Sequence, residues 1–151
     1  MDWTHGEYTL TDDRAKLDVG VVCMLLWETY WAGDRSQDTI EQSINNSLNF
    51  TLLHQGRQVG FSRVVTDYTT VSYLCDVILA PEHRGKGLGK WMLEKILEHP
   101  RLSTTRMDLF TRDAQKFYGQ FGFAKHKFDC MVRYPPNYAG GGEAAKAAKN
   151  Q

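Results

Sequence analysis

The sequence RGKGLG, Arg84–Gly89, places three glycines at alternate positions between an apolar run, SYLCDVIL (Ser72–Leu79), and an amphipathic run, KWMLEKILEH (Lys90–His99). Apolar residues recur at helical spacing in the second run and Pro100 follows it, so we expect a buried strand, a glycine loop and a helix. The backbone N–H groups of such a loop, at the positive end of a helix, can bind an anion. Glycine repeats also form plain tight turns, and the loop alone leaves both interpretations open.

The glycine spacing excludes two well-known phosphate loops. A P-loop requires four residues between its first glycine and a Gly-Lys-Ser/Thr ending. Here Gly85 and Gly89 enclose three residues, and Trp91 replaces the hydroxyl residue. A dinucleotide-binding fingerprint requires a glycine at the position of Lys90. Neither a P-loop nucleotide hydrolase nor a Rossmann enzyme fits this chain.

Length, charge and composition exclude further classes of protein. The chain has 151 residues, 42% of them hydrophobic, which suits one domain with a substantial core. Lys and Arg together number 18, as do Asp and Glu, so the formal net charge is zero. No long basic run and no apolar run of membrane-spanning length is present. We therefore expect neither nucleic acid nor a membrane as a partner.

The cysteines and the termini indicate a cytoplasmic protein without a metal. Cys23, Cys75 and Cys130 are odd in number, far apart and set among apolar residues, which is typical of reduced core thiols, and no Cys/His metal cluster is visible. The first residues lack the apolar core behind a basic start that a secretory signal requires. We expect one domain over residues 1–138 and a low-complexity, flexible tail over residues 139–151.

Two helices are expected between a first strand and the rest of the sheet. Residues Leu17–Trp31 are too densely apolar for a strand, so we predict a largely buried helix that ends near Gly33 with a left-handed cap. In the next segment, Asp38 and Glu41 have the spacing of a capping box. The apolar residues that follow share one helical face: Ile40, Ile44 and Leu48.

Strands are expected on both sides of the glycine loop. Phe50–His54 and Gln58–Thr66, separated by a glycine turn, predict a hairpin. Ser72–Leu79 adds a third strand, whose nearly continuous apolar residues indicate burial on both faces. The chain beyond the loop helix predicts a strand, a short helix and two final strands: Arg106–Phe110, Asp113–Phe121, Phe123–Phe128 and Cys130–Tyr134. The fold class is therefore α/β (α+β), with a mixed central sheet of about six to seven strands and flanking helices.

Two motifs resemble those of the GNAT superfamily of N-acetyltransferases. The family's central motif is Arg or Gln, two residues, Gly, one residue, and Gly or Ala, and Arg84, Gly87 and Gly89 fill it. A second motif, on a short helix, is matched within DAQKFYGQFGF by Ala114, Phe117, Tyr118, Gly122 and Phe123. The resemblance covers residues 7–134 and implies the GNAT fold, in which the sheet splays between its fourth and fifth strands.

The resemblance implies acetyl-CoA as a co-substrate. In this family the loop and the helix start cradle its pyrophosphate, which corresponds here to backbone groups of Arg84, Gly85, Lys86, Gly87, Leu88, Gly89 and Lys90. The pantetheine arm binds main chain that corresponds to Val77, Ile78 and Leu79, with a backbone N–H near Val77 facing the thioester oxygen. Phe117 is also expected to contact the coenzyme. Many family members have an Asn where this chain has Thr111, so the resemblance leaves that coenzyme contact open.

Tyr118 corresponds to the family's usual general acid. A phenol has a pKa near ~10 and a thiol near ~8.5, so the phenol can protonate a departing thiolate without a large shift. The alternative is an aromatic core residue with a solvated hydroxyl group, which is common for tyrosine on a short helix.

Asp76 interrupts an otherwise apolar strand, where an unpaired carboxylate would be costly to bury. Either it caps backbone groups at a bulge, or it faces the cleft, where desolvation favours proton uptake. We nominate Asp76 as the leading general base, acting directly or through water. Glu28 and His83 are weaker candidates, with His83 expected at the surface beside the coenzyme loop.

The first two helices and their connection border the acceptor cleft in this family, which brings in Trp27, Glu28, Tyr30 and Trp31, with Asp34 and Arg35 nearby. An aromatic wall with carboxylates suits a cationic amine. The alternative is that these aromatic side chains are part of the core.

The expected function is transfer of the acetyl group of acetyl-CoA to a primary amine of a small molecule, by direct attack in a ternary complex. A protein or peptide amine is the alternative acceptor. A non-catalytic module that senses acetyl-CoA is the alternative from another class. The sequence is compatible with a homodimer, and it leaves the oligomeric state and the acceptor open.

Overall fold

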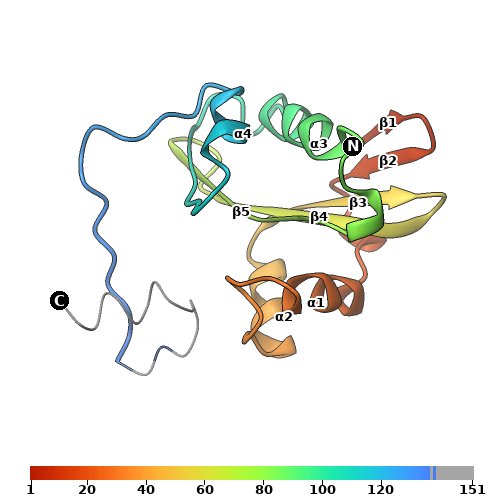
Figure 1. Cartoon of the computed structure of the whole chain (residues 1–151), viewed down its shortest axis with the longest axis horizontal. Coiled ribbons are helices and arrows are strands. Elements are labelled where there is room, and N and C mark those ends of the chain that lie inside the picture. Colours follow the sequence, from red (N-terminus) through yellow and green to blue (C-terminus); the bar gives the residue numbers. More distant parts are fainter. Residues whose placement is uncertain (137, 139–151) are drawn as a thin grey trace.

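The computed structural model describes residues 1–136 and 138, which form a six-stranded mixed sheet with four α-helices (Figure 1). The strands are β1 Asp2–His5, β2 Tyr8–Thr11, β3 Leu48–His54, β4 Arg57–Thr66, β5 Val71–Leu79 and β6 Arg106–Asp108. The helices are α1 Val19–Trp27, α2 Gln37–Asn45, α3 Leu88–Leu97 and α4 Gln115–Gly119, with 3-10 turns at Arg14–Lys16 and Pro81–His83. None of these helices is long and apolar enough to cross a membrane.

The strands lie in the sheet in the order in which they follow one another in the chain. Neighbours from β1 to β5 pair antiparallel, and β5 pairs with β6 in parallel. This confirms the expected α+β class, and the six strands match the lower end of the expected range of six to seven. The expected tail, residues 139–151, lies outside the described residues.

Both ends of the chain differ from the strand predictions. β1 was not expected, and it pairs with β2 across a hairpin with Gly6 at a φ of 58°. The strands expected at Phe123–Phe128 and Cys130–Tyr134 are wrong, because this segment has no strand pairing and most of its residues are exposed. Apolar alternation alone does not make a strand when no neighbouring strand supplies hydrogen bonds.

The first two helices begin and end at other residues than expected. α1 stops at Trp27, because the Thr29 hydroxyl donates to the Leu26 carbonyl at 2.7 Å and so competes with the helical hydrogen bond. Gly33 is not a left-handed cap; a Cβ there would lie 2.8 Å from the Thr29 carbonyl oxygen. The N-cap of α2 is Ser36, whose hydroxyl accepts from the Thr39 backbone N–H, and not Asp38.

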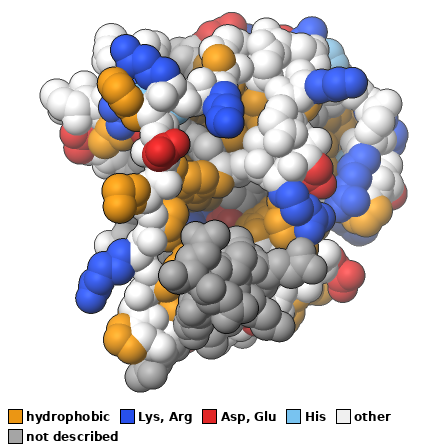
Figure 2. All heavy atoms as spheres, turned by 60° about the vertical axis from the view of Figure 1, so that its left-hand side comes forward, with side chains coloured by type: hydrophobic (Ala, Val, Ile, Leu, Met, Phe, Trp, Pro, Cys, Tyr) orange, Lys and Arg blue, Asp and Glu red, His pale blue; other side chains and the backbone are white. Residues whose placement is uncertain are grey.

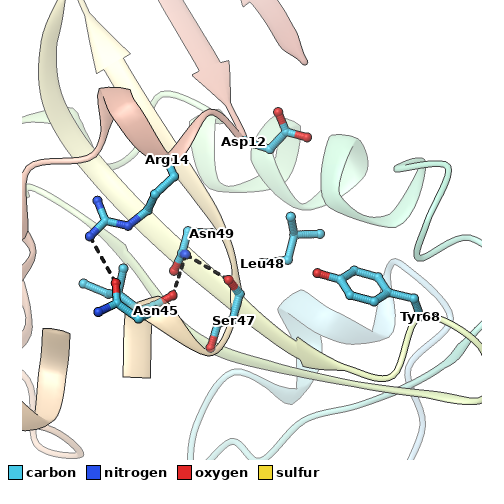
Figure 3. A pocket seen from close by; sticks show the side chains of 8 residues that line it. Asp12, Arg14, Asn45, Ser47, Leu48, Asn49 and Tyr68 are labelled. Atoms are coloured by element: carbon cyan, nitrogen blue, oxygen red, sulfur yellow. Dashed lines mark hydrogen bonds between the residues drawn. The ribbon is translucent and has the colours of Figure 1, made fainter. Parts of the chain in front are cut away.

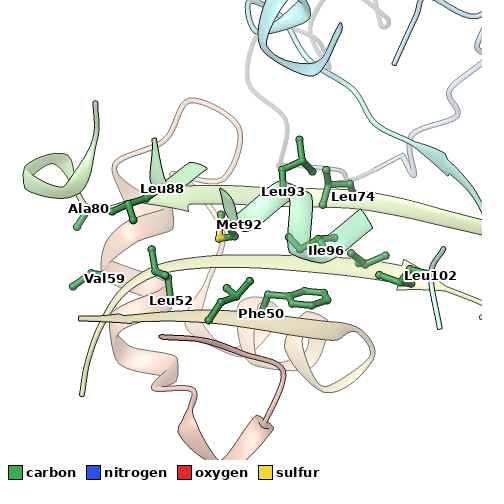
Figure 4. Close-up of a cluster of buried hydrophobic side chains, with 12 residues drawn as sticks. Phe50, Leu52, Val59, Leu74, Ala80, Leu88, Met92, Leu93, Ile96 and Leu102 are labelled. Atoms are coloured by element: carbon green, nitrogen blue, oxygen red, sulfur yellow. The ribbon is translucent and has the colours of Figure 1, made fainter. Parts of the chain in front are cut away.

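Two hydrophobic layers cover the two faces of the sheet, with α3 and α4 on one face and α1 and α2 on the other (Figure 1). On the α3 face, the fully buried Met92, Leu93 and Ile96 lie against side chains of the strands (Figure 4). On the opposite face, Ile40 and Ile44 of α2 belong to a cluster built around α1. Cys23 is buried there and Cys75 is half-buried, but Cys130 is exposed, so the expectation of a core thiol is wrong for Cys130.

β5 departs from a regular strand in two ways. It is not buried on both faces, because its residues alternate between buried and more exposed positions. Its pairing with β4 slips: Phe61 pairs with Ile78 and Arg63 with Cys75, so β5 carries one extra residue at Asp76 and Val77. Asp76 has a φ of 55°, which is the conformation of a bulge residue.

β5 and β6 separate soon after they begin. Their parallel pairing covers only Val71–Tyr73 against Arg106–Asp108, so the rest of β5 has no strand on that side within residues 1–136 and 138. This is the expected splay, and it lies between the fifth and sixth strands because β1 adds one to the count. The bulge and the splay together open the sheet where the site was expected.

Candidate active site

A cavity of about 960 Å³ lies where β5 and β6 separate. β5 contributes residues 73–77, and the segment that follows β6 contributes residues 109–114. The connection between α1 and α2 supplies Tyr30, Trp31 and Arg35, and α4 supplies Tyr118. Figure 2 shows this side of the molecule, hollowed near its centre and bordered by hydrophobic and basic side chains.

A group of side chains joined by hydrogen bonds forms part of the cavity wall, and we call it the Asp76 cluster: the buried Asp76 and the half-buried Arg35, Arg63 and Trp31. Arg35 Nη1 donates to Asp76 Oδ1 and Oδ2 at 3.0 and 3.1 Å. Arg63 Nε donates to Oδ2 at 2.5 Å, and Trp31 Nε1 donates to Oδ1 at 3.1 Å. The side chain of Asp76 is 1% exposed, so the two ion pairs are shielded from water.

The surroundings of Asp76 differ from both alternatives that the sequence left open. Asp76 lies at a bulge, but the hydrogen bonds of its carboxylate within the described residues go to side chains and not to backbone groups. It also lines the cavity, with both oxygens already engaged by Arg35, Arg63 and Trp31. A general base needs a free lone pair aimed at the proton that it removes. These contacts favour an anchoring role for Asp76, and its role as a base stays a prediction.

Tyr118 lies on α4 and lines the same cavity. Its ring makes edge contacts with Phe117 and Phe123, at centroid distances of 5.1 and 5.8 Å. Burial raises the pKa of Tyr118 above its ordinary value, and Tyr30 adds to this shift. The Tyr118 phenol therefore keeps its proton at neutral pH, as a general acid must.

Two other titratable groups of the cavity are neutral near pH 7. Burial raises the pKa of Tyr73 to about 12 and that of Cys75 to about 11. Cys75 therefore stays a thiol rather than a reactive thiolate.

The glycine loop has the geometry of an anion site. Gly85 and Gly87 have φ angles of 72° and 75°, in the left-handed region, and Gly87 is the N-cap of α3 without a side-chain cap. The backbone N–H groups of residues 85–90 make no hydrogen bond within the described part of the chain. A Cβ at either glycine would meet nothing within 4 Å, so the space beside the loop is open. These N–H groups, with the exposed Lys86 and Lys90 beside them, fit a phosphate group.

Of the other residues expected around the coenzyme, two lie where a coenzyme could contact them and two are engaged in other contacts. Phe117 approaches the start of α3, where its Cζ would lie 3.9 Å from a Cβ at Gly89. Val77 lies at the bulge and has no partner in the ladder with β4. By contrast, the Ile78 side chain packs into the core on the α1 face, and the Leu79 carbonyl accepts from Arg84 Nε at 2.9 Å.

The structure does not bring every candidate to the cavity. Trp27 and Glu28 are exposed and do not line it; Trp27 Nε1 instead donates to the Arg35 carbonyl at 2.8 Å, which ties down the connection to α2. His83 was expected at the surface, but it is 8% exposed. Its Nδ1 is 2.9 Å from the Tyr8 hydroxyl oxygen, so it serves to hold β2 against the loop. Of the residues expected around the acceptor, Tyr30, Trp31 and the neighbouring Arg35 line the cavity.

Sequence reasoning missed several residues that line the cavity. They include Arg63, Tyr73 and the neighbours of Thr111 within residues 109–113, whereas Thr111 itself was considered as a coenzyme contact. Arg63 carries a detectable signal, because it is a charged residue inside the apolar strand GFSRVV, opposite another such strand that contains Asp76. Opposite charges inside two strands of one hairpin indicate a cross-strand ion pair. The segment 109–113 carries no comparable signal.

A second cavity, of about 220 Å³, lies between the end of α2 and β3 (Figure 3). Asn49 Nδ2 donates there to the carbonyl oxygens of Ile44 and Ser47, at 2.8 and 3.0 Å, while Asn49 Oδ1 has no partner within the described residues. None of the expected site residues lines this cavity. Its polar lining suits an ordered water molecule.

Comparisons with known proteins agree with this geometry. Residues 45–125 match the acetyltransferase (GNAT) domain family. A Gibberella zeae protein provisionally named as an acetyltransferase is 32% identical over 166 aligned residues, which cover 89% of this chain and 94% of that protein. A crystal structure from Xanthomonas campestris pv. campestris, assigned to the GNAT family, is 37% identical with a TM-score of 0.82, and the match covers 88% of this chain and 95% of that one.

One solved structure that shares the fold contains a coenzyme. N-acetylglutamate synthase from Neisseria gonorrhoeae, solved with coenzyme A and N-acetyl-glutamate, has a TM-score of 0.64 over 78% of this chain and 28% of its own. At 15% identity, this match concerns the fold alone.

Proposed function

Because the chain belongs to the GNAT family of acetyltransferases, we propose that it transfers the acetyl group of acetyl-CoA to a primary amine of a small molecule, by direct attack in a ternary complex. The family uses acetyl-CoA. The observation that carries the proposal is that Tyr118 and the bulge residue Val77 line one cavity, which opens where β5 and β6 separate.

The residues of the glycine loop fit the coenzyme. The unpaired N–H groups of residues 85–90 would hold its pyrophosphate, and Lys86 and Lys90 would add positive charge. Bound acetyl-CoA would supply a thioester, whose carbonyl carbon is open to attack by a neutral amine. The Val77 backbone at the bulge is free of the ladder with β4, and its N–H is the candidate donor to the thioester oxygen.

Tyr118 is the candidate general acid. It holds a proton at its hydroxyl group at neutral pH, because burial raises its pKa. From the cavity wall it would donate that proton to the departing sulfur. The incoming amine must lose a proton as the amide forms, and a base for this proton is not assigned, since both Asp76 oxygens are engaged.

The proposal is tested by binding and by turnover. Acetyl-CoA in excess should raise the melting temperature of the protein, since a ligand that binds the native state stabilises it. Thiol release from acetyl-CoA should then depend on an added amine, and a panel of polyamines, arylalkylamines, amino sugars, amino acids and short peptides identifies the acceptor class. The hydrolysis rate without an amine is the control.

Each alternative has its own outcome in this experiment. Thiol release with short peptides alone would replace the small-molecule acceptor by a protein or peptide amine. Stabilisation by acetyl-CoA without turnover on any amine of the panel would favour a sensor module. Absence of stabilisation at millimolar acetyl-CoA would contradict the proposal as a whole.

A further inference from the structure

The Asp76 cluster has an unbalanced charge. It contains two guanidinium groups, Arg35 and Arg63, and one carboxylate, Asp76. Arginine stays protonated in proteins, so the cluster carries a surplus of one positive charge. The two arginine side chains are only 23% and 12% exposed, so water screens this surplus poorly.

The other groups that line the cavity do not neutralise the surplus charge. Arg112 and Asp113 lie 3.8 Å apart, are both exposed, and balance each other. Tyr73 and Cys75 are neutral near pH 7, because burial raises the pKa of the phenol to about 12 and that of the thiol to about 11. Asp76 is therefore the only carboxylate among the described lining residues that contacts Arg35 or Arg63.

Part of each guanidinium group is still available as a hydrogen-bond donor. Arg35 uses only Nη1 for Asp76, and its Nε and Nη2 make no hydrogen bond within residues 1–136 and 138. Arg63 uses Nε for Asp76 and Nη1 for the Ser47 hydroxyl at 3.2 Å. The Nε and Nη2 atoms of one guanidinium form a fork that matches two oxygens of a carboxylate or a phosphate.

We propose that the acceptor amine carries an anionic carboxylate or phosphate group, which binds the unpaired edge of Arg35 and balances the surplus charge of the Asp76 cluster. This inference rests on the proposed function, because it assigns the acceptor of the same site. It differs from the cationic acceptor that the aromatic residues of the sequence favour. Asp76 holds Arg35 and Arg63 in place, and Arg35 selects the acceptor.

The first test compares matched pairs of amines in the thiol-release assay. L-phenylalanine and phenethylamine differ by a carboxylate, and glucosamine 6-phosphate and glucosamine differ by a phosphate, so the two pairs separate the two anions. We expect kcat/KM to be at least about tenfold higher for the member that carries the anionic group in one of the pairs, as a charge-assisted hydrogen bond allows. Equal values, or a preference for the members without the anionic group, would overturn the inference while leaving the proposed function in place.

The second test changes the arginine. Arg35→Gln should remove the preference for the amine that carries the anionic group, by raising the KM of that amine more than the KM of its partner. Arg35→Lys, which keeps the charge but lacks the fork, should retain part of the preference. Arg57→Gln is the control, because Arg57 is an exposed arginine of β4 that does not line the cavity. A preference that survives in Arg35→Gln would overturn the inference.

A binding measurement covers the case in which none of these amines is acetylated. With coenzyme A present, N-acetyl-phenylalanine should raise the melting temperature more than N-acetyl-phenethylamine, and N-acetylglucosamine 6-phosphate more than N-acetylglucosamine, for at least one of the two pairs. The difference should vanish in Arg35→Gln and persist in Arg57→Gln. No difference in either pair would overturn the inference. Loss of stabilisation by acetyl-CoA itself is a separate result, which would remove the proposed function and this inference with it.

Discussion

At the scale of single residues, Asp76 has the largest effect on the structure of the site. Its backbone has a φ of 55°, and its buried carboxylate joins Arg35 from the α1–α2 connection to Arg63 from β4. Aspartate tolerates the left-handed region better than most residues, which suits it to the bulge. One side chain therefore stabilises the bulge, the cavity wall and the position of two arginines.

Replacing Asp76 tests its anchoring role. Asp76→Asn leaves two buried guanidinium groups without a counter-charge, so we expect the free energy of unfolding to fall by about 3–5 kcal/mol, measured by urea denaturation. Asp113→Asn, in an exposed pair, should change the free energy of unfolding by less than about 1 kcal/mol.

The pH profile of Asp76→Asn tests whether Asp76 is the base. If Asp76 anchors the two arginines and is not the base, the acidic limb of the kcat/KM profile should be the same in Asp76→Asn as in the wild type. Disappearance of that limb without loss of stability would instead identify Asp76 as the base.

Replacing Tyr118 tests the general acid. Tyr118→Phe should lower kcat by about 100-fold, because the departing sulfur loses its proton donor, while the stabilisation by acetyl-CoA is unchanged. The acid form is the active form and the pKa of Tyr118 lies above its ordinary value of 10.0, so the alkaline limb of the wild-type pH profile should lie beyond that value. Tyr68→Phe, outside the cavity, is the control. Unchanged turnover in Tyr118→Phe would exclude Tyr118 from the mechanism.

At the scale of elements, the junction between β5 and α3 positions the coenzyme site. The first N–H groups of α3 have no intrahelical partners, and Gly87, its N-cap in a left-handed conformation, has no side chain to cap them. α4 lies beside the same helix start through Phe117. The loop thus links the strand that carries the bulge to the start of α3, and α4, which carries Tyr118, lies beside that helix start.

Gly87→Ala tests this junction. Alanine in the left-handed region costs about 1–2 kcal/mol of stability, and relaxation of the loop should also weaken acetyl-CoA binding. Gly6→Ala is the matched control: Gly6 has a φ of 58° and equally open surroundings, but it lies in the β1–β2 hairpin. Both variants should lose similar stability by urea denaturation, and only Gly87→Ala should show a raised Kd for acetyl-CoA in a titration. A similar rise in Gly6→Ala would contradict a specific role for the loop.

At the scale of the whole molecule, one sheet separates two hydrophobic layers, and the site opens where the sheet divides. The α3 layer and the α1–α2 layer both include side chains of β4 and β5 (Figures 1 and 4). The Asp76 cluster connects the sheet to the α1–α2 side. The two layers should therefore unfold together.

Core substitutions on each face test this cooperativity. Leu93→Ala and Ile40→Ala, both at fully buried positions, should each lower the free energy of unfolding by about 2–5 kcal/mol. Fluorescence and circular dichroism should report a single coincident transition for both variants. Met24→Ala, at a side chain that is 61% exposed, should change the stability by less than about 0.5 kcal/mol. Separate transitions for the two faces would contradict a shared unit.

The sequence by itself determined the elements whose signals are local. Glycine spacing, helical periodicity and the hairpin turn predicted α3, β3, β4 and β5 and the loop at residues 84–89, because backbone sterics and hydrophobic periodicity act over a few residues. The same signals failed at Phe123–Phe128, where the apolar pattern has no strand to pair with.

Only the tertiary structure decided what surrounds Asp76 and Tyr118. Arg35, Arg63 and Asp76 are separated by 13 to 41 positions in the chain, and a hydrogen bond over that separation depends on the bulge and the register of β5. Likewise, Trp31 lines the cavity while Trp27, four residues earlier, binds the Arg35 carbonyl, because α1 ends between them. Local patterns determine which residues form helices and strands, whereas the charge and shape of the site depend on contacts that only packing creates.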